Sequence, residues 1–291
     1  MTERGRLVPL ALAGAIVSIS FAAIFFRLAA PTHPLIVAGT RLVIASALLA
    51  PFVLRAWRRG RLPSRVLQRA VICGLLYAVH FGTWVTSLTL TSVASSVTLV
   101  TATPLLLALL SFATGRDHPE RRHWISIGLA LVGLSFIGWA DLSLSADALL
   151  GDGLALAGAA AMAFYLLLVR GLGEDLDVLG FGGVATAVGG AALFAAALAL
   201  GVPIAWASPA SLGWIAMSAL VPQLIGHNLL TWSLRHAKPT AVGIATVGEP
   251  VGATFLAWAW LGERLGPVVA VGCAITLAAV ILSLRRRPAP V

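Results

Sequence analysis

Residues 244–255 read IATVGEPVGATF, and they place a carboxylate beside a proline inside an apolar run that extends from Ala241 to Leu261. A run of about 20 apolar residues has the length that a helix needs to cross the hydrocarbon core of a bilayer. Lipid offers the backbone no hydrogen-bond partners, so such a segment crosses as a helix. A proline removes one helical hydrogen bond, and a carboxylate in lipid is costly. The stretch therefore predicts a kinked membrane helix whose Glu249 faces protein or water.

Other apolar segments of similar length fill the rest of the chain. Of its 291 residues, 59% are hydrophobic and 11% are charged, whereas a soluble domain carries about 25% charged residues. Long runs without strict alternation favour helices over barrel strands. We predict an all-α integral membrane protein with ten transmembrane helices, at about residues 8–29, 34–55, 67–88, 92–114, 122–139, 149–170, 178–202, 211–235, 239–261 and 266–285.

The net charge of +9 is distributed like a topology signal rather than a nucleic-acid footprint. With ten helices and a cytoplasmic N-terminus, every Lys and Arg except Arg27, Arg41 and Arg264 falls in a cytoplasmic segment. This is the positive-inside pattern. We therefore expect a multi-pass protein of the bacterial inner membrane, with both termini in the cytoplasm, that contacts lipid headgroups and no nucleic acid.

The two halves of the chain repeat each other. ALAGAI at 11–16 matches ALAGAA at 155–160, an offset of 144 residues, and His80 in the third segment matches His227 in the eighth, an offset of 147. We divide the chain into two five-helix units, 8–140 and 149–286. Because five is odd, the second unit enters the membrane from the opposite side, as in the inverted repeats of many secondary transporters. The alternative is a duplication that only builds a stable bundle.

Three stretches carry a resemblance to a known family: RLVIASALLAPF at 41–52, TSVASSVTLVTATPLLLALL at 91–110 and PTAVGIATVGEPVGATFLAWAWLGERL at 239–265. With the two sets of five helices, they resemble the EamA-type branch of the drug/metabolite transporter superfamily. The first half departs from the pattern, because Gly115-Arg116 stands where Gly-Glu is expected and no carboxylate accompanies Pro104. The resemblance implies a permease or exporter of small metabolites. It leaves the substrate open among amino acids, drugs, sugars and phosphorylated compounds.

Glu249 is the one acidic residue that lies deep in a predicted helix. Two roles are open for it. It could bind a proton or the amino group of a substrate, or it could stabilise the backbone that Pro250 disrupts, by accepting hydrogen bonds or pairing with Arg41. For Arg41 we expect a side chain that extends to the outer surface; the alternative is a bond to a substrate carboxylate.

Polar and aromatic residues form a stripe on the third predicted helix. Residues three or four apart share a helix face, and the stripe consists of Tyr77, His80, Trp84, Ser87 and Thr91. The eighth helix carries Gln223, His227 and Thr231, with Asn228 and Trp232 alongside. Together with Tyr165, Phe21 and Phe25, the two stripes predict a cavity with aromatic walls and a few neutral hydrogen-bonding groups.

We predict substrate contacts for Tyr77, His80, Trp84, Tyr165, His227, Trp232, Glu249 and Phe21. Structural alternatives exist for most of them. A membrane histidine often bonds a neighbouring helix, Trp84 and Trp232 suit the aromatic belt near the headgroups, and Phe21 and Phe25 suit packing.

Motifs for other chemistry are missing from the sequence. It contains no P-loop, no HExxH and no nucleophile elbow, and Cys73 and Cys273 both fall in predicted helices, so we expect neither a metal nor another cofactor. We expect a secondary transporter rather than an enzyme, one that moves small amphipathic metabolites, amino acids including aromatic ones, by alternating access. Its partners would be the substrate, membrane lipids and, if transport is coupled, protons. The alternatives are an exporter of drugs or other metabolites and an intramembrane lipid-acting enzyme with His80 and His227 as acid and base.

Overall fold

A computed structural model describes residues 3–91, 93–113, 115, 120–138, 145–173, 176–262 and 266–284. Within these ranges the regular structure is helical and contains no strand, as predicted. The elements are α1 (Glu3–Leu28), α2 (Pro34–Arg58), α3 (Ser64–Leu90), α4 (Val93–Val100), α5 (Thr103–Ala113), α6 (Arg121–Gly138), α7 (Ala146–Arg170), α8 (Val178–Ala199), α9 (Pro209–Ser218), the π-helix η2 (Ala219–His227), α10 (Asn228–Leu234), α11 (Pro239–Thr246), α12 (Gly248–Leu261) and α13 (Pro267–Leu284). Arg116, Glu263 and Arg264 lie outside the described residues.

Three of the predicted crossings are divided into shorter helices. The fourth consists of α4 and α5, the eighth of α9, η2 and α10, and the ninth of α11 and α12. In the described part of the chain, 7 helical segments are long and apolar enough to cross a membrane, and Ser95–Leu107 and Pro267–Ser283 are shorter apolar helices. A multi-pass membrane protein is supported, while the count of ten crossings stays a prediction.

Prolines explain where the fourth and ninth segments break. Pro104 and Pro250 have no N–H and cannot bond the carbonyl four residues earlier. Those carbonyls belong to Val100 and Thr246, where α4 and α11 end. The kink expected beside Glu249 is therefore confirmed, and the first half has a break at the corresponding proline.

Short polar side chains start the helices that follow connections. The Asp177 carboxylate accepts a hydrogen bond of 3.0 Å from the Gly180 N–H at the start of α8, and Ser208 Oγ accepts one of 3.0 Å from the Ser211 N–H at the start of α9. Each bond satisfies a donor that a helix N-terminus leaves unpaired. The polar breaks of the sequence thus become helix boundaries.

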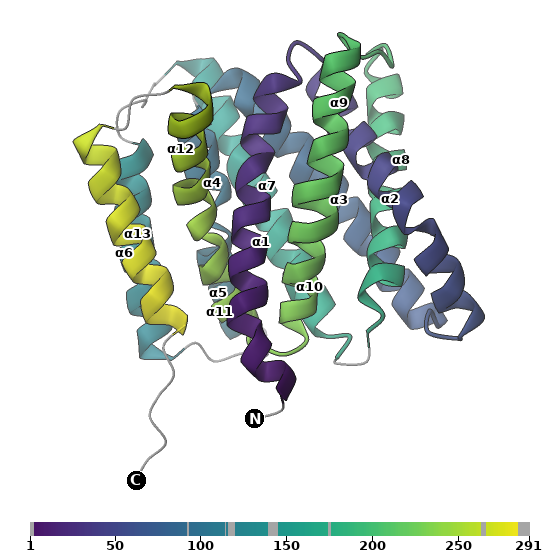
Figure 1. The fold of residues 1–291 in the computed structure, drawn as a ribbon, viewed down its shortest axis with the longest axis horizontal. Coiled ribbons are helices and arrows are strands. Elements are labelled where there is room, and N and C mark those ends of the chain that lie inside the picture. Colours follow the sequence, from purple (N-terminus) through teal and green to yellow (C-terminus); the bar gives the residue numbers. More distant parts are fainter. Residues whose placement is uncertain are drawn as a thin grey trace.

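The segments alternate in direction through the bundle (Figure 1). Thr91 Oγ1 donates to Asp152 Oδ1 at 2.9 Å, which joins the end of α3 to the start of α7. Arg69 Nη1 donates to the Leu168 carbonyl at 3.2 Å, which joins the start of α3 to the end of α7. The helices α3 and α7 are therefore antiparallel. In Figure 1, α1 starts at the lower end of the bundle, where α13 ends.

Packing between helices follows one pattern in both halves. Helix α2 packs against α8, and α6 packs against α13. Helix α3 packs against α7, and the corresponding segment of the second half, α9 to α10, packs against α1. Exchanging the corresponding segments of the two halves leaves this set of contacts unchanged, which is the arrangement that two related units produce.

Large apolar side chains cover much of the outside of the bundle. Phe255, Trp258, Phe112 and Leu198 are among many that are exposed. Contiguous apolar surface of this kind is rare on soluble monomers, and lipid tails solvate it readily. The exterior thus agrees with the hydropathy of the segments in assigning the chain to a membrane.

Gly133 marks a close contact between α6 and α13, and we expect Gly133→Ala to be destabilising. A Cβ at this position would overlap Thr276 Oγ1 and lie 2.8 Å from the Gly272 carbonyl oxygen. Overpacking of this kind costs about 1–3 kcal/mol, so the melting temperature of the purified protein in detergent should fall. The matched control is Gly128→Ala on the same helix, where a Cβ meets nothing within 4 Å. Equal melting temperatures for the two variants would contradict this packing.

Candidate functional site

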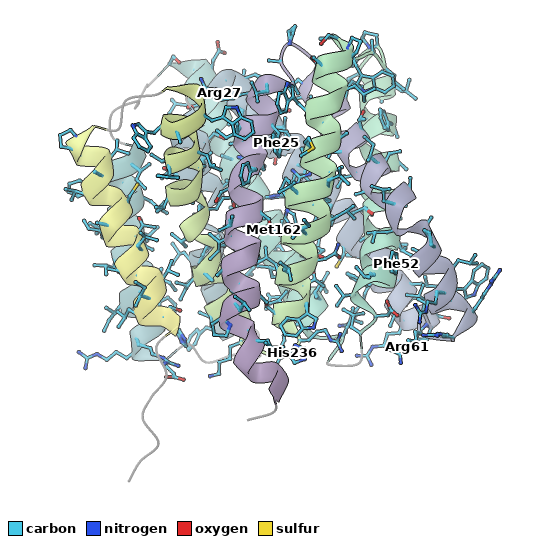
Figure 2. The ribbon with its side chains drawn as sticks, viewed as in Figure 1. Phe25, Arg27, Phe52, Arg61, Met162 and His236 are labelled. Carbon is cyan, nitrogen blue, oxygen red and sulfur yellow. The ribbon has the colours of Figure 1, made fainter. Side chains whose placement is uncertain are left out.

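A cavity lies inside the bundle, at about half its height. About 50 Å³ of it is open to the centres of water molecules, and a single water needs roughly 10–15 Å³ by this measure, so a few fit. In Figure 2, Met162 of the lining lies between Arg27 near the upper end and His236 near the lower end. Both halves of the chain supply the walls, which consist of Ile19, Ala22, Arg41, His80, Trp84, Val100, Thr101, Thr103, Met162, Leu166, His227, Leu230, Thr246 and Glu249.

Both proline breaks border this cavity. Thr101 and Thr103 flank the break between α4 and α5, while Thr246 and Glu249 flank the break between α11 and α12. At membrane depth, interrupted backbone is tolerated where it lines protein or water. Glu249 lies in the first turn of α12, where the partial positive charge of the helix N-terminus stabilises a carboxylate.

The two histidines that the repeat pairs both line the cavity. His80 Nδ1 lies 2.9 Å from the Gly158 carbonyl oxygen, and because a carbonyl only accepts, Nδ1 is the donor. This bond ties α3 to α7, so His80 fills the interhelical role and also forms part of the wall. The ring of His227 meets those of Tyr77 and Phe81 edge-on, with centroids 5.7 Å and 5.5 Å apart.

Arg41 does not extend to the outer surface, and that expectation is wrong. Its side chain is 0% exposed and lines the cavity. The guanidinium carbon lies 4.4 Å from the centre of the Phe81 ring and 5.3 Å from that of Phe26. Contacts between a cation and aromatic faces offset part of the cost of burying this charge. Neither ring is adjacent to Arg41 in the sequence, so the helix position alone could not reveal the direction of the side chain.

The Glu249 carboxylate has no hydrogen bond or ion pair with the residues that the structure describes, although it and Arg41 line the same cavity. The two side chains make no direct salt bridge, although they interact electrostatically across the cavity. The main-chain carbonyl of Glu249 instead accepts a hydrogen bond of 3.3 Å from Ser20 Oγ. The Ser20 hydroxyl also lies 2.7 Å from the Ile16 carbonyl oxygen, and the half-buried Glu249 side chain faces the cavity.

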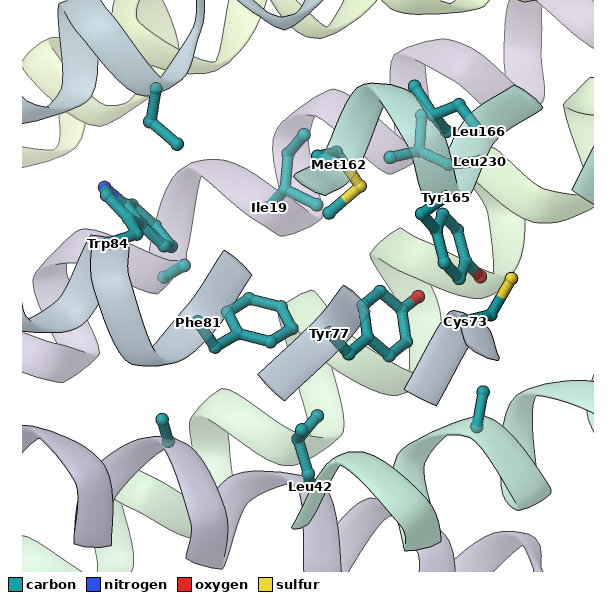
Figure 3. Close-up of a cluster of buried hydrophobic side chains, with 14 of the residues drawn as sticks. Ile19, Leu42, Cys73, Tyr77, Phe81, Trp84, Met162, Tyr165, Leu166 and Leu230 are labelled. Atoms are coloured by element: carbon teal, nitrogen blue, oxygen red, sulfur yellow. The ribbon is translucent and has the colours of Figure 1, made fainter. Parts of the chain in front are cut away.

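The aromatic residues of the third segment divide between the cavity and the core behind it. Trp84 is buried and lines the cavity, with its ring 5.8 Å from that of His80. Tyr77 and Tyr165 stack with centroids 4.4 Å apart (Figure 3), but neither is among the lining residues. The Tyr165 hydroxyl is 3.0 Å from Thr231 Oγ1. The two tyrosines therefore support the wall rather than form it.

Phe21 and Trp232 lie away from the cavity. Phe21 stacks on Phe25 at 5.6 Å, and both rings meet Trp260 edge-on, in a cluster toward the upper end of the bundle (Figure 2). Trp232 lies 4.4 Å from the ring of His236, which Figure 2 places near the lower end. The structure thus brings His80, Trp84, His227 and Glu249 together and leaves these two residues outside.

Several lining residues were not anticipated from the sequence. Thr101, Thr103, Met162 and Thr246 line the cavity, yet the threonines look like ordinary small residues of packed helices. The signal in the sequence was that the three threonines lie just before Pro104 or Pro250, since polar residues just before a proline lie where the helix opens.

Comparisons with known proteins bear on this arrangement. The EamA-like transporter family matches residues 7–139 and again residues 149–285. No curated protein matches the chain. Among solved structures, 29 chains match. One of them, described only as "Crystal structure of protein", is 19% identical, covers 95% of this chain and 96% of its own, and has a TM-score of 0.76. At that identity the likeness shows a shared fold.

Proposed function

The chain belongs to the EamA-like transporter family, within the drug/metabolite transporter superfamily, and we propose that it is a secondary transporter of amino acids, aromatic ones included. Transport would proceed without ATP and by alternating access. The membrane would be the bacterial inner membrane. Drugs and other small amphipathic metabolites are the competing substrates within the same family.

The observation that carries this proposal is the meeting of the two proline breaks at one cavity. Transporters with inverted repeats bind their substrates near the bilayer midplane, between discontinuous helices at corresponding positions of the two halves. Here Thr101 and Thr103 come from the first break, and Thr246 and Glu249 come from the second. A cavity of this kind is where a substrate would bind.

We propose further that residues 8–140 and 149–286 are inverted repeats and that the chain crosses the membrane ten times. The antiparallel course of α3 and α7 supports this inversion, because these helices begin at opposite ends of the bundle. Arg61 and His236 lie near the end at which α1 starts (Figure 2). Basic residues at that end support a cytoplasmic location for both termini.

The chemistry of the cavity supports the choice of amino acids. The Glu249 carboxylate would bind the ammonium group, and His80 and His227 would offer hydrogen bonds. Trp84 and the rings behind it would pack against an aromatic side chain. Since only a few waters fit at present, the helices would separate at the breaks to admit a whole substrate.

Uptake into proteoliposomes tests the proposal. We expect vesicles that contain the purified protein to accumulate labelled phenylalanine, tyrosine or leucine faster than empty vesicles. The panel should also contain cationic drugs and uncharged metabolites. Flux of those compounds without any flux of amino acids would contradict the substrate class, and no flux of any compound would contradict transport.

We also expect proton coupling, because Glu249 is an acidic group that borders the cavity and whose side chain makes no hydrogen bond with the described residues. An imposed pH gradient should then drive amino acids against their own concentration gradient. The control is the same gradient collapsed by a protonophore. Accumulation that never exceeds the external concentration, with or without the pH gradient, would indicate facilitated diffusion instead.

A further inference from the structure

Arg41 carries a charge that the described structure does not satisfy. Its Nε, Nη1 and Nη2 atoms are all buried, and none has a hydrogen-bond partner. A buried charge without hydrogen bonds costs several kcal/mol, and buried polar groups of this kind call for a specific explanation. An anion that enters the cavity would supply the missing acceptors.

The aromatic rings beside Arg41 hold its position without using its donors. Phe26 and Phe81 contact the guanidinium within cation–π distance, at 5.3 Å and 4.4 Å. A ring face attracts the charge, but it does not accept the N–H groups that radiate in the guanidinium plane. The planar fork of an arginine matches the two oxygens of a carboxylate. Arg41 is therefore fixed in place with its carboxylate-binding edge unoccupied by protein.

The cavity also holds an acidic group. Glu249 lines it too, and the described structure contains no ion pair between Glu249 and Arg41. An acidic and a basic group that border one cavity without a direct hydrogen bond between them would both gain partners from a molecule that carries an ammonium group and a carboxylate. An α-amino acid is such a molecule, and its binding would leave the net charge of the cavity unchanged.

We propose that Arg41 is the carboxylate-binding residue of the cavity and that the ligand is a zwitterion, with its carboxylate on Arg41 and its ammonium group toward Glu249. The assignment rests on the proposed function. It makes a narrower claim, since a transporter of amines or of neutral drugs would not need Arg41. The carboxylate of the substrate would then determine which compounds bind, rather than being merely tolerated.

Three compounds that differ only in their charged groups test the assignment: phenylalanine, phenethylamine without the carboxylate, and 3-phenylpropionate without the amine. Their binding to the purified full-length protein can be measured by calorimetry and by competition with labelled phenylalanine. A charge-assisted bond predicts that phenylalanine binds at least about tenfold more tightly than phenethylamine. Arg41→Gln should reduce that ratio to near one, because glutamine carries no charge to pair with the carboxylate, and the variant should still bind phenethylamine. Arg41→Lys should retain part of the ratio.

Arg27→Gln is the matched control, because it removes an exposed arginine at the end of α1 and should preserve the ratio. Binding of phenethylamine by Arg41→Gln shows that the variant is folded. If that variant does not fold, the ratio of the affinities for phenylalanine and phenethylamine in the unmodified protein still tests the proposal. Equal affinities for phenylalanine and phenethylamine there would overturn the role of Arg41 while leaving amino-acid transport intact. Binding of none of the three compounds would overturn both.

Discussion

Thr246→Phe is expected to reduce amino-acid flux to the level of empty vesicles. Thr246 lines the cavity beside the second proline break, and the larger side chain would occupy the space that now accommodates a few waters. A substrate would then have to displace a packed ring. Overpacking by one such group costs about 3 kcal/mol at the upper end of its usual range, which corresponds to at least about a 100-fold loss.

The same substitution at Thr89 provides the control for this prediction. Thr246 and Thr89 each donate a hydrogen bond to the carbonyl three residues earlier, that of Gly243 and of Thr86. Thr89 is exposed on α3 and does not line the cavity. Thr89→Phe should therefore transport at the normal rate. Normal flux through Thr246→Phe, with the protein folded, would show that substrates follow another route.

Glu249→Gln is expected to abolish most of the flux of amino acids. It should leave the fold of the protein unchanged. Loss of one partner from a desolvated charge pair costs about 2–5 kcal/mol, so the rate at low substrate concentration should fall by about 30-fold or more. The carboxylate has no hydrogen bond to the described residues, and glutamine has the same size. We therefore expect the melting temperature to change little.

Competition and melting-temperature measurements distinguish a substrate contact from a structural role for Glu249. Competition by 3-phenylpropionate, which has no ammonium group, should not be weakened by Glu249→Gln. Glu120→Gln is the control, because Glu120 forms ion pairs with Arg122 and Lys238 that are partly exposed and such pairs contribute little. A lower melting temperature of Glu249→Gln with unchanged flux would assign the carboxylate to the support of the break at Pro250.

The sequence was sufficient to predict the helical membrane class and the kink at Glu249. Apolar runs of similar length identify membrane segments, because lipid requires apolar side chains and a helical backbone. Pro250 breaks the ninth segment because it has no N–H to donate to the Thr246 carbonyl. The pairing of His80 with His227 likewise led to one cavity, which both residues line. These features depend on properties that each segment carries by itself.

Features that depend on contacts between distant segments could not be predicted. Arg41 points inward and lies beside Phe26 and Phe81, and no spacing along α2 reveals these neighbours. Tyr77 shares the helix face of His80, yet the ring of Tyr165 covers it. A helix face specifies which residues turn inward, whereas the cavity wall depends on which of those residues another helix covers.

Labelling of a single cysteine at position 101 from the two faces of the membrane tests alternating access most directly. Thr101→Cys would be built in a background with Cys73→Ala and Cys273→Ala, because Cys73 and Cys273 are the cysteines of the chain. Thr101 lines the cavity at the first break. We predict that a membrane-impermeant maleimide reacts when it is added to either face and that phenylalanine slows both reactions. Labelling from one face alone, whether or not substrate is present, would contradict a site that opens to each side in turn.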